Sequence, residues 1–446
     1  MRGTAISTIK PRVVIAGGGL AGTEAAWQLA ERGVDVVLYE MRPVRTTDAH
    51  QTDRLAELVC SNSLKSDQHP SASWLLKEEL RRLDSLLLRA AAIARVPGGQ
   101  ALTVDRNVFG AEVTGAIEAH PRIEIRREEM TDVDPAHPTI VATGPLTSDN
   151  LASGIGRLTG SGRLFFYDSI SPIVDAQTID RAIAFPASRY DKSLDGTGDY
   201  LNCPFNKAEY EHFVDELTAA QAVDSHIPND VPYFEACLPI EEIARRGRDT
   251  LRFGPMKPMG LTDPRTGRRP WAAVQLRQEN LRADSYNLVG FQNHLRFAEQ
   301  KRIMRLIPGL ENAEFLRYGQ IHRNTYINAP ALLNDTLQLR DHTNVFFAGQ
   351  ISGVEGYVES IATGLAAGLM MAAYIRGEAL RPFPRKTAIG SLLYYISHAD
   401  PKHYQPANIA FDLFPPLENS PRDRRDRQIA VCGLAQEKLN AYVGTH

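Results

Sequence analysis

The sequence has few cysteines and no long apolar run. Only four of its 446 residues are cysteine, and no two of them form a CxxC pair. A disulfide framework, a zinc site or another metal site is therefore not expected, and the thiols should be reduced. No run of about 18 apolar residues predicts a transmembrane helix, and the opening MRGTAISTIK lacks the apolar stretch of a signal peptide. We therefore expect a cytoplasmic protein.

The chain also lacks a strong net charge. Its formal charge is −3, with 43% hydrophobic and 23% charged residues, which is typical of a globular protein of two or three domains. A nucleic-acid partner would need a local basic patch. Three arginine clusters could supply one, although any one of them is also explained as a solvated face. They are Arg245, Arg246, Arg248 and Arg252; Arg265, Arg268 and Arg269; and Arg422, Arg424, Arg425 and Arg427, among which two aspartates are interleaved.

The strongest local signal lies near the N-terminus, in RVVIAGGGLAGTEAAWQLAERGVDVVLYE. It predicts a strand over 13–16, a GxGxxG turn, a helix over 23–32 and a second strand over 34–39. Glycines at the three motif positions permit the tight turn, the approach of a pyrophosphate and close helix–strand packing. Glu40 follows where an acid can accept hydrogen bonds from a ribose. The predicted cofactor contacts here are Gly17, Gly18, Gly19, Leu20, Ala21, Gly22 and Glu40.

Two later segments favour FAD over NAD as the nucleotide. Residues 139–145, TIVATGP, predict a buried strand that ends in Thr-Gly. Residues 344–368 predict a strand, a glycine-rich turn and a small-residue helix, whose N-terminus would face a polar edge of a flavin. A second strand–helix packing unit is the alternative for that segment. The predicted contacts in it are Gly349, Gln350, Gly353, Gly356 and Tyr357.

The predicted fold class is α/β: a doubly wound, Rossmann-like FAD-binding domain with an inserted smaller α/β domain. The FAD-binding domain would comprise residues 1–195 and 301–446. Residues 196–300 would form the insertion, which binds RNA or substrate. Leucines at helical spacing between residues 76 and 87 predict one packing helix across 72–94.

Two cysteines have polar surroundings. Cys60 lies in ELVCSNSLKSD and Cys237 precedes a short predicted helix. A nearby cation or helix N-terminus favours a thiolate. The residues alone favour the alternative, two inert, buried thiols.

Several motifs resemble those of the folate-dependent tRNA uracil-5 methyltransferases, an FAD-containing family, along nearly the whole chain. They include GGGLAGTEAAWQLA, YEMRP, AELVCSNSL, FEACLPIE, RGRDTLRFGPMKPMGL and FFAGQISGVEGYVES. The CSNS and GVEGYVES blocks are specific to that family. Related wobble-uridine flavoproteins share the glycine turn but lack CSNS and carry a long helical C-terminal domain. One departure is Ala236, where the family pattern has glycine.

The resemblance implies methylation of carbon-5 of the T-loop uridine in tRNA. Methylenetetrahydrofolate would be the one-carbon donor, FAD the reductant, and NADH or NADPH the source of electrons. Cys60 and Cys237 would be the catalytic cysteines, with Cys237 the preferred nucleophile, and Arg245 to Arg252 would bind RNA. Three alternatives remain: the same chemistry on a ribosomal RNA uridine, a flavin-containing RNA-binding or RNA-folding protein without methylation, and an FAD oxidoreductase acting on small molecules.

Overall fold

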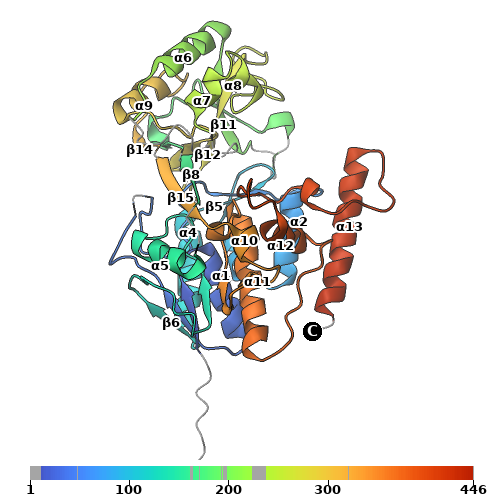
Figure 1. The fold of residues 1–446 in the computed structure, drawn as a ribbon. Helices are drawn as coiled ribbons and strands as arrows, with labels where there is room; N and C mark the ends of the chain where they lie inside the picture. The colour runs from blue at the N-terminus through green and yellow to red at the C-terminus, as the bar shows by residue number, and fades with distance from the viewer. Residues whose placement is uncertain are drawn as a thin grey trace, which may run out of the picture.

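The computed structural model describes residues 12–47, 49–160, 164–169, 171–191, 193, 198–223, 238–319 and 321–444, with the backbone alone for 164–169 and 321–323. It contains two six-stranded sheets, each with its own buried hydrophobic core. Figure 1 shows the two units stacked, with β8 (Leu164–Ser169) and β15 (Ile321–Tyr326) paired antiparallel between them.

The larger unit is built on a sheet of strand order β16-β17-β7-β1-β2-β6. Five of these strands are parallel, and β16 runs antiparallel to β17. This arrangement is the predicted doubly wound, Rossmann-like sheet. The strands are β1 (Val13–Ala16), β2 (Val36–Tyr39), β6 (Ile123–Arg126), β7 (Thr139–Val141), β16 (Gln338–Leu339) and β17 (His342–Phe347).

Two helices rich in small residues pack against each other beside this sheet. They are α1 (Leu20–Glu31) and α11 (Tyr357–Ile375). A Cβ atom on Gly364 would lie 2.3 Å from the carbonyl oxygen of Ala21, and one on Gly368 would lie 2.9 Å from that of Ala25. Only glycine permits the two backbones to come this close. The N-terminal and C-terminal parts of the chain thus share one core.

Further helices surround the sheet, and a small sheet of strand order β3-β5-β4 carries the segment after Cys60. The predicted single helix over 72–94 is wrong: the chain breaks at Asp84, which has φ +56°, and the Ser85 side chain caps a second helix. The elements are β3 (Ser63–Ser66), α2 (Ala72–Arg82), α3 (Leu86–Ile93), β4 (Arg95–Val96), β5 (Ala101–Val104), α4 (Arg106–Ala119), α5 (Asp149–Thr159), α10 (Ala329–Leu332), α12 (Ala388–His398) and α13 (Arg424–Val443).

The smaller unit contains an antiparallel sheet of strand order β10-β11-β12-β13-β9-β14. Its strands extend from residue 173 to residue 317, beyond the predicted 196–300, because β9 and β14 pair with each other across the base of the insertion. The elements are β9 (Ile173–Asp175), β10 (Phe185–Ala187), β11 (Tyr200–Phe205), α6 (Lys207–Ala219), α7 (Ile240–Arg245), α8 (Thr250–Phe253), β12 (Ala272–Gln278), β13 (Ser285–Leu288), α9 (Phe297–Met304) and β14 (Phe315–Arg317).

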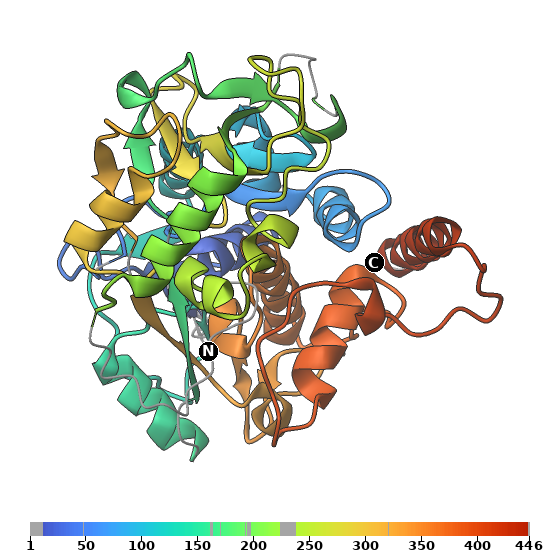
Figure 2. The same cartoon turned by 90° about the horizontal axis from the view of Figure 1, so that it is seen from above.

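One described helix, α11, is long and apolar enough to cross a membrane by length and composition. Most of it is buried inside the protein, against α1 and the sheet, as in the core helix of a globular domain. Figure 2 shows the C-terminal helix α13 at one side of the larger unit, where it packs against α2.

Candidate active site

The first glycine turn has the strained geometry that the motif predicts. Gly17 has φ +104°, and a Cβ there would lie 2.6 Å from the carbonyl oxygen of Ala142. A Cβ on Gly22 would lie 1.9 Å from the carbonyl oxygen of Gly17. Neither position has room for a side chain, so both must be glycine for the turn to keep this backbone path.

The N-terminus of α1 is open. Among the described residues, no side chain caps this helix and no acid lies in its first turn. A Cβ on Gly19 would meet no atom within 4 Å. A pocket begins here, lined by the glycine turn, Tyr39, Glu40 and, across from them, Thr143 and Thr147. Unpaired N–H groups at the positive end of a helix bind phosphate, so this geometry fits a pyrophosphate.

The Glu40 carboxylate is fixed by two neighbours. Its Oε2 accepts hydrogen bonds from Gly18 N (3.1 Å) and Arg42 Nη2 (3.0 Å). Its Oε1 accepts from Arg42 N (3.0 Å) and Arg42 Nε (2.9 Å). Burial disfavours the charge, but the bonds and the positive charge of Arg42 outweigh it and hold the Glu40 pKa below its ordinary value. The acid is therefore ionised and ties the glycine turn to the end of β2.

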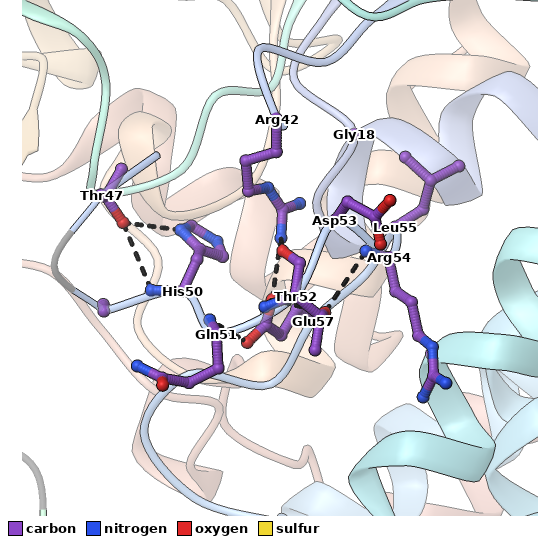
Figure 3. Close-up of polar contacts among 12 residues, drawn as sticks. Gly18, Arg42, Thr47, His50, Gln51, Thr52, Asp53, Arg54, Leu55 and Glu57 are labelled. Atoms are coloured by element: carbon purple, nitrogen blue, oxygen red, sulfur yellow. Dashed lines mark hydrogen bonds and ion pairs between the residues drawn. The ribbon is translucent and has the colours of Figure 1, made fainter. Parts of the chain in front are cut away.

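Arg42 extends the network to the loop over 50–57, drawn in Figure 3, which reaches this pocket at His50. Its side chain is almost wholly buried, and its Nη1 donates to Glu57 Oε2 (2.9 Å) and to the carbonyl oxygen of Thr52 (3.2 Å). Glu57 in turn accepts from Gln51 N (2.7 Å) and from the Thr52 hydroxyl (2.9 Å). The loop over 50–57 is thereby held by one arginine that also orients Glu40.

The second glycine turn lies against the first. Gly349 has φ +78°, and its Cβ would lie 2.8 Å from the Cβ of Ala21 in the first turn of α1. Gly356 has φ +94° and begins α11, with Tyr357 as the first helical residue. The structure therefore brings together the two segments that the sequence assigned to one cofactor.

Cys60 lies at the N-terminal end of α11. The hydroxyl oxygen of Tyr357 accepts hydrogen bonds from the backbone N–H of Cys60 (2.8 Å) and of Ser61 (3.0 Å). Burial raises the pKa of Tyr357, so it stays a neutral phenol. Five residues on, Lys65 forms an ion pair with Glu359 of α11 (2.8 Å). The half-buried Cys60 is thus held beside the second glycine turn.

Cationic groups from both units surround the Cys60 loop. Arg277 of β12 donates to the Ser61 hydroxyl (2.9 Å). Arg106 donates to the carbonyl oxygens of Leu58 (2.6 Å) and Cys60 (3.3 Å), and pairs with Glu279 (2.7 Å). Burial disfavours the Arg106 charge, but Glu279 outweighs it and raises the Arg106 pKa.

Three guanidinium groups act electrostatically on the Cys60 thiol: those of Arg106, Arg277 and Arg317. The Cys60 sulfur therefore lies in positively charged surroundings at the junction of the two units.

The remaining cysteines have different surroundings. Cys203 and Cys432 are buried, and burial raises both thiol pKa values, that of Cys432 to about 12. These two are inert packing thiols. Cys237 lies outside the described residues.

The predicted RNA-binding arginines are largely paired within the chain. Arg245 forms an ion pair with Glu242, and Arg248 forms two bonds to Asp215 (2.7 and 2.9 Å). The Arg252 guanidinium stacks 3.6 Å from the Trp271 ring centre. The fourth member, Arg246, is exposed.

Sequence reasoning missed the Arg106–Glu279 pair and the role of Arg42. Arg106 and Glu279 are 173 residues apart, and neither belongs to a local motif. Arg42 lies in the YEMRP block, two residues after Glu40. An arginine so close in sequence to a carboxylate at a strand end could have suggested an ion pair between them.

Comparisons with known proteins agree with this geometry. Residues 12–379 match the profile of the family described as glucose inhibited division protein A. The chain is 69% identical over 434 residues to the methylenetetrahydrofolate–tRNA-(uracil-5-)-methyltransferase TrmFO of Solibacter usitatus, covering 96% of this chain and 98% of that one. It is 61% identical over 439 residues to the TrmFO of Koribacter versatilis, covering 97% and 98%. The chain belongs to the TrmFO family.

The fold of this TrmFO family member is also that of a solved structure. GidA of Aquifex aeolicus, in its form II crystal, superposes with a TM-score of 0.69 at 17% identity, covering 97% of this chain and 74% of that one. At that identity the likeness shows the fold alone.

Proposed function

We propose that this chain methylates carbon-5 of the T-loop uridine in tRNA, in the cytoplasm, with methylenetetrahydrofolate as the one-carbon donor. The observation that carries the proposal is the near full-length identity to relatives named as tRNA uracil-5 methyltransferases. Those names specify tRNA, which favours tRNA over ribosomal RNA. The cationic Cys60 loop beside a nucleotide pocket supports an enzyme and not a binding protein.

FAD is the proposed cofactor, and bound, reduced FAD would supply the two electrons that convert a methylene into a methyl group. Its phosphates would lie on the backbone N–H groups of 19–22. Glu40 would orient its ribose, and the 349–357 turn would face its ring. NADH or NADPH is the proposed source of the electrons.

The two cysteines divide the work on uracil. Addition of the Cys237 thiolate to carbon-6 of uracil forms a C–S bond and moves electron density to carbon-5, which can then bond the one-carbon unit. Carbon-5 must afterwards lose its proton so that the C–S bond can break and the ring regain its double bond. The Cys60 thiolate, held between Tyr357 and the arginines, would take that proton.

RNA must bring the uridine to the junction of the two units, because Cys60 and the β12 residue Arg277 meet there. The uridine has to leave its stack so that both carbons can be reached. The Arg245, Arg246, Arg248 and Arg252 cluster is the sequence-based candidate for phosphate contact in the smaller unit.

A labelling experiment tests the substrate. Purified protein would receive labelled methylenetetrahydrofolate, NADPH and undermodified total RNA, followed by nucleoside analysis of separated tRNA and ribosomal RNA. We expect label in 5-methyluridine at the T-loop position of tRNA. Label only in ribosomal RNA would retain the chemistry and overturn the substrate.

A further inference from the structure

A second exposed basic cluster lies at the start of α13, away from the predicted RNA-binding arginines. It consists of Arg422, Arg424, Arg425 and Arg427, here named the α13 arginine cluster, and all four side chains are exposed. None of their guanidinium groups forms an ion pair or hydrogen bond with another described residue. Arg245 and Arg248, in contrast, are paired with acids of their own unit.

Helix stability does not account for this cluster. The N-terminus of a helix carries a partial positive charge, so arginines there are unfavourable and acids are favourable. Asp423 caps α13 by accepting from Arg425 N (2.8 Å) and Asp426 N (3.0 Å), which offsets part of that cost. The four arginines outnumber the neighbouring Asp423 and Asp426, so the start of α13 keeps a net positive charge, which is the unfavourable sign for a helix N-terminus.

A polar pocket borders the cluster. It is lined by Arg424 and Arg425 together with hydroxyl and amide side chains. Arginine, serine and glutamine side chains are the groups that commonly contact phosphate and sugar oxygens of nucleic acids. The hydroxyl and amide side chains of the lining belong to Ser66, Gln68, Ser71, Gln100 and Gln428, and His69, Pro70 and the capping residue Asp423 complete it.

The same pocket is joined to the active site by one strand. Ser66 ends β3, and Cys60 lies six residues earlier, so their Cα atoms are at most about 22 Å apart. In Figure 1 the N-terminal end of α13 lies level with the junction of the two units, while its C-terminal end points away from the junction.

We propose that the α13 arginine cluster binds the phosphate backbone of the RNA whose uridine reaches Cys60. This inference rests on the proposed function and specifies a second contact with the same substrate. Anionic phosphates would neutralise the exposed guanidinium groups, and the pocket hydroxyls and amides would contact neighbouring sugar oxygens. The RNA would thus be held on both sides of the Cys60 loop.

The test compares two variants of equal charge change. In the first, Arg424, Arg425 and Arg427 are replaced by glutamine. In the matched control, Arg122, Arg157 and Arg376 are replaced by glutamine; each of these is exposed and paired with an acid of the larger unit. Dissociation constants for undermodified tRNA would be measured on flavin-loaded protein across a salt series.

The first variant should bind tRNA on the order of tenfold more weakly, and its slope of log K against log salt should fall by about two to three. The control should match the wild type in both. Flavin absorbance and thermal unfolding report whether each variant is folded. The single variant Arg424→Gln should lower the slope of log K against log salt by about one.

An unchanged slope in both the triple and the single variant would overturn the inference, as would equal weakening in the control. Methyl transfer by the wild type distinguishes failure of the α13 contact from failure of the proposed function. If the wild type methylates tRNA while the slopes stay unchanged, the proposed function stands and only the α13 contact is wrong. If the wild type transfers no methyl group to tRNA, the proposed function itself fails.

Discussion

Gly19 and Gly115 share one property: a side chain added at either position would meet no atom within 4 Å. Gly19→Glu should therefore fold, as should Gly115→Glu in the exposed face of α4. We expect Gly19→Glu to lose FAD binding, because its carboxylate would occupy the phosphate position at the start of α1 and repel the phosphates. Gly115→Glu should bind FAD normally.

Flavin fluorescence titration of the two apoproteins measures this difference. Equal FAD affinity in the two variants would contradict the placement of the pyrophosphate at Gly19.

The cysteines permit a four-way comparison. Cys60→Ala and Cys237→Ala should keep FAD and lose at least about a hundredfold in methyl transfer, because each removes a sulfur that bonds the uracil or removes its carbon-5 proton. Cys203→Ala and Cys432→Ala remove buried, inert thiols and should remain active, at a cost of about 1–2 kcal/mol in unfolding free energy. Single-turnover assays with excess enzyme provide the rates. Full activity in Cys60→Ala would show that its polar loop has no role in the chemistry.

For single residues, the sequence predicted those features that require one residue type at one position. Gly17 and Gly22 could be assigned from spacing because only glycine fits their backbone geometry. The arginines around Cys60 could not, because Arg106 and Arg277 reach it from distant segments through the fold.

Among the elements, the contact between α1 and α11 sets the relative position of the two glycine turns. Gly364→Leu should destabilise the protein by about 3 kcal/mol or more and weaken FAD binding, because its side chain would be forced against the Ala21 carbonyl. Gly433→Ala in α13 is the control: its added methyl meets no atom, so it should be neutral or stabilise by up to about 1 kcal/mol. Urea unfolding with flavin and tryptophan fluorescence measures both.

Glu79 gives α2 a pH-dependent contact with α12. Its carboxylate accepts from the N–H groups of Ala388 (2.6 Å) and Ile389 (2.8 Å), yet burial dominates and raises its pKa to about 8. Because the folded pKa exceeds the unfolded value, the stabilisation is complete below about pH 4.5 and is lost as pH rises through about 8.

The unfolding free energy of the wild type, relative to Glu79→Gln, should therefore fall by roughly 4 kcal/mol between pH 5 and pH 9. Taking the difference between the two proteins cancels other titrating groups, including the buried Lys77. Urea unfolding at the two pH values gives the numbers, and a constant difference would show that Glu79 is ionised throughout.

The sequence predicted elements well where pattern and turn chemistry agreed, as at β1, where the predicted and observed bounds coincide. It joined α2 and α3 because the leucine spacing continues across the break. The cause of the break is local: Asp84 takes a left-handed conformation and Ser85 caps the next helix.

For the whole molecule, the insertion was predicted and its limits were not. The pairing of β9 with β14 joins segments about 140 residues apart, and strand pairing at that distance leaves no periodic signal in either segment. Within the predicted limits, the smaller unit presents Arg277 and Glu279 to the Cys60 loop and to Arg106. The active site is therefore a property of the junction and not of either unit alone.

The most direct test of the account is the choice of methyl donor. Undermodified tRNA, NADPH and the FAD-loaded protein would be incubated with methylenetetrahydrofolate alone or with S-adenosylmethionine alone. A methylene donor needs two electrons to become a methyl group, whereas a sulfonium donor transfers a finished methyl and leaves a flavin without a task. The account predicts 5-methyluridine only with methylenetetrahydrofolate, and only when NADPH is present. Methylation with S-adenosylmethionine alone would contradict it.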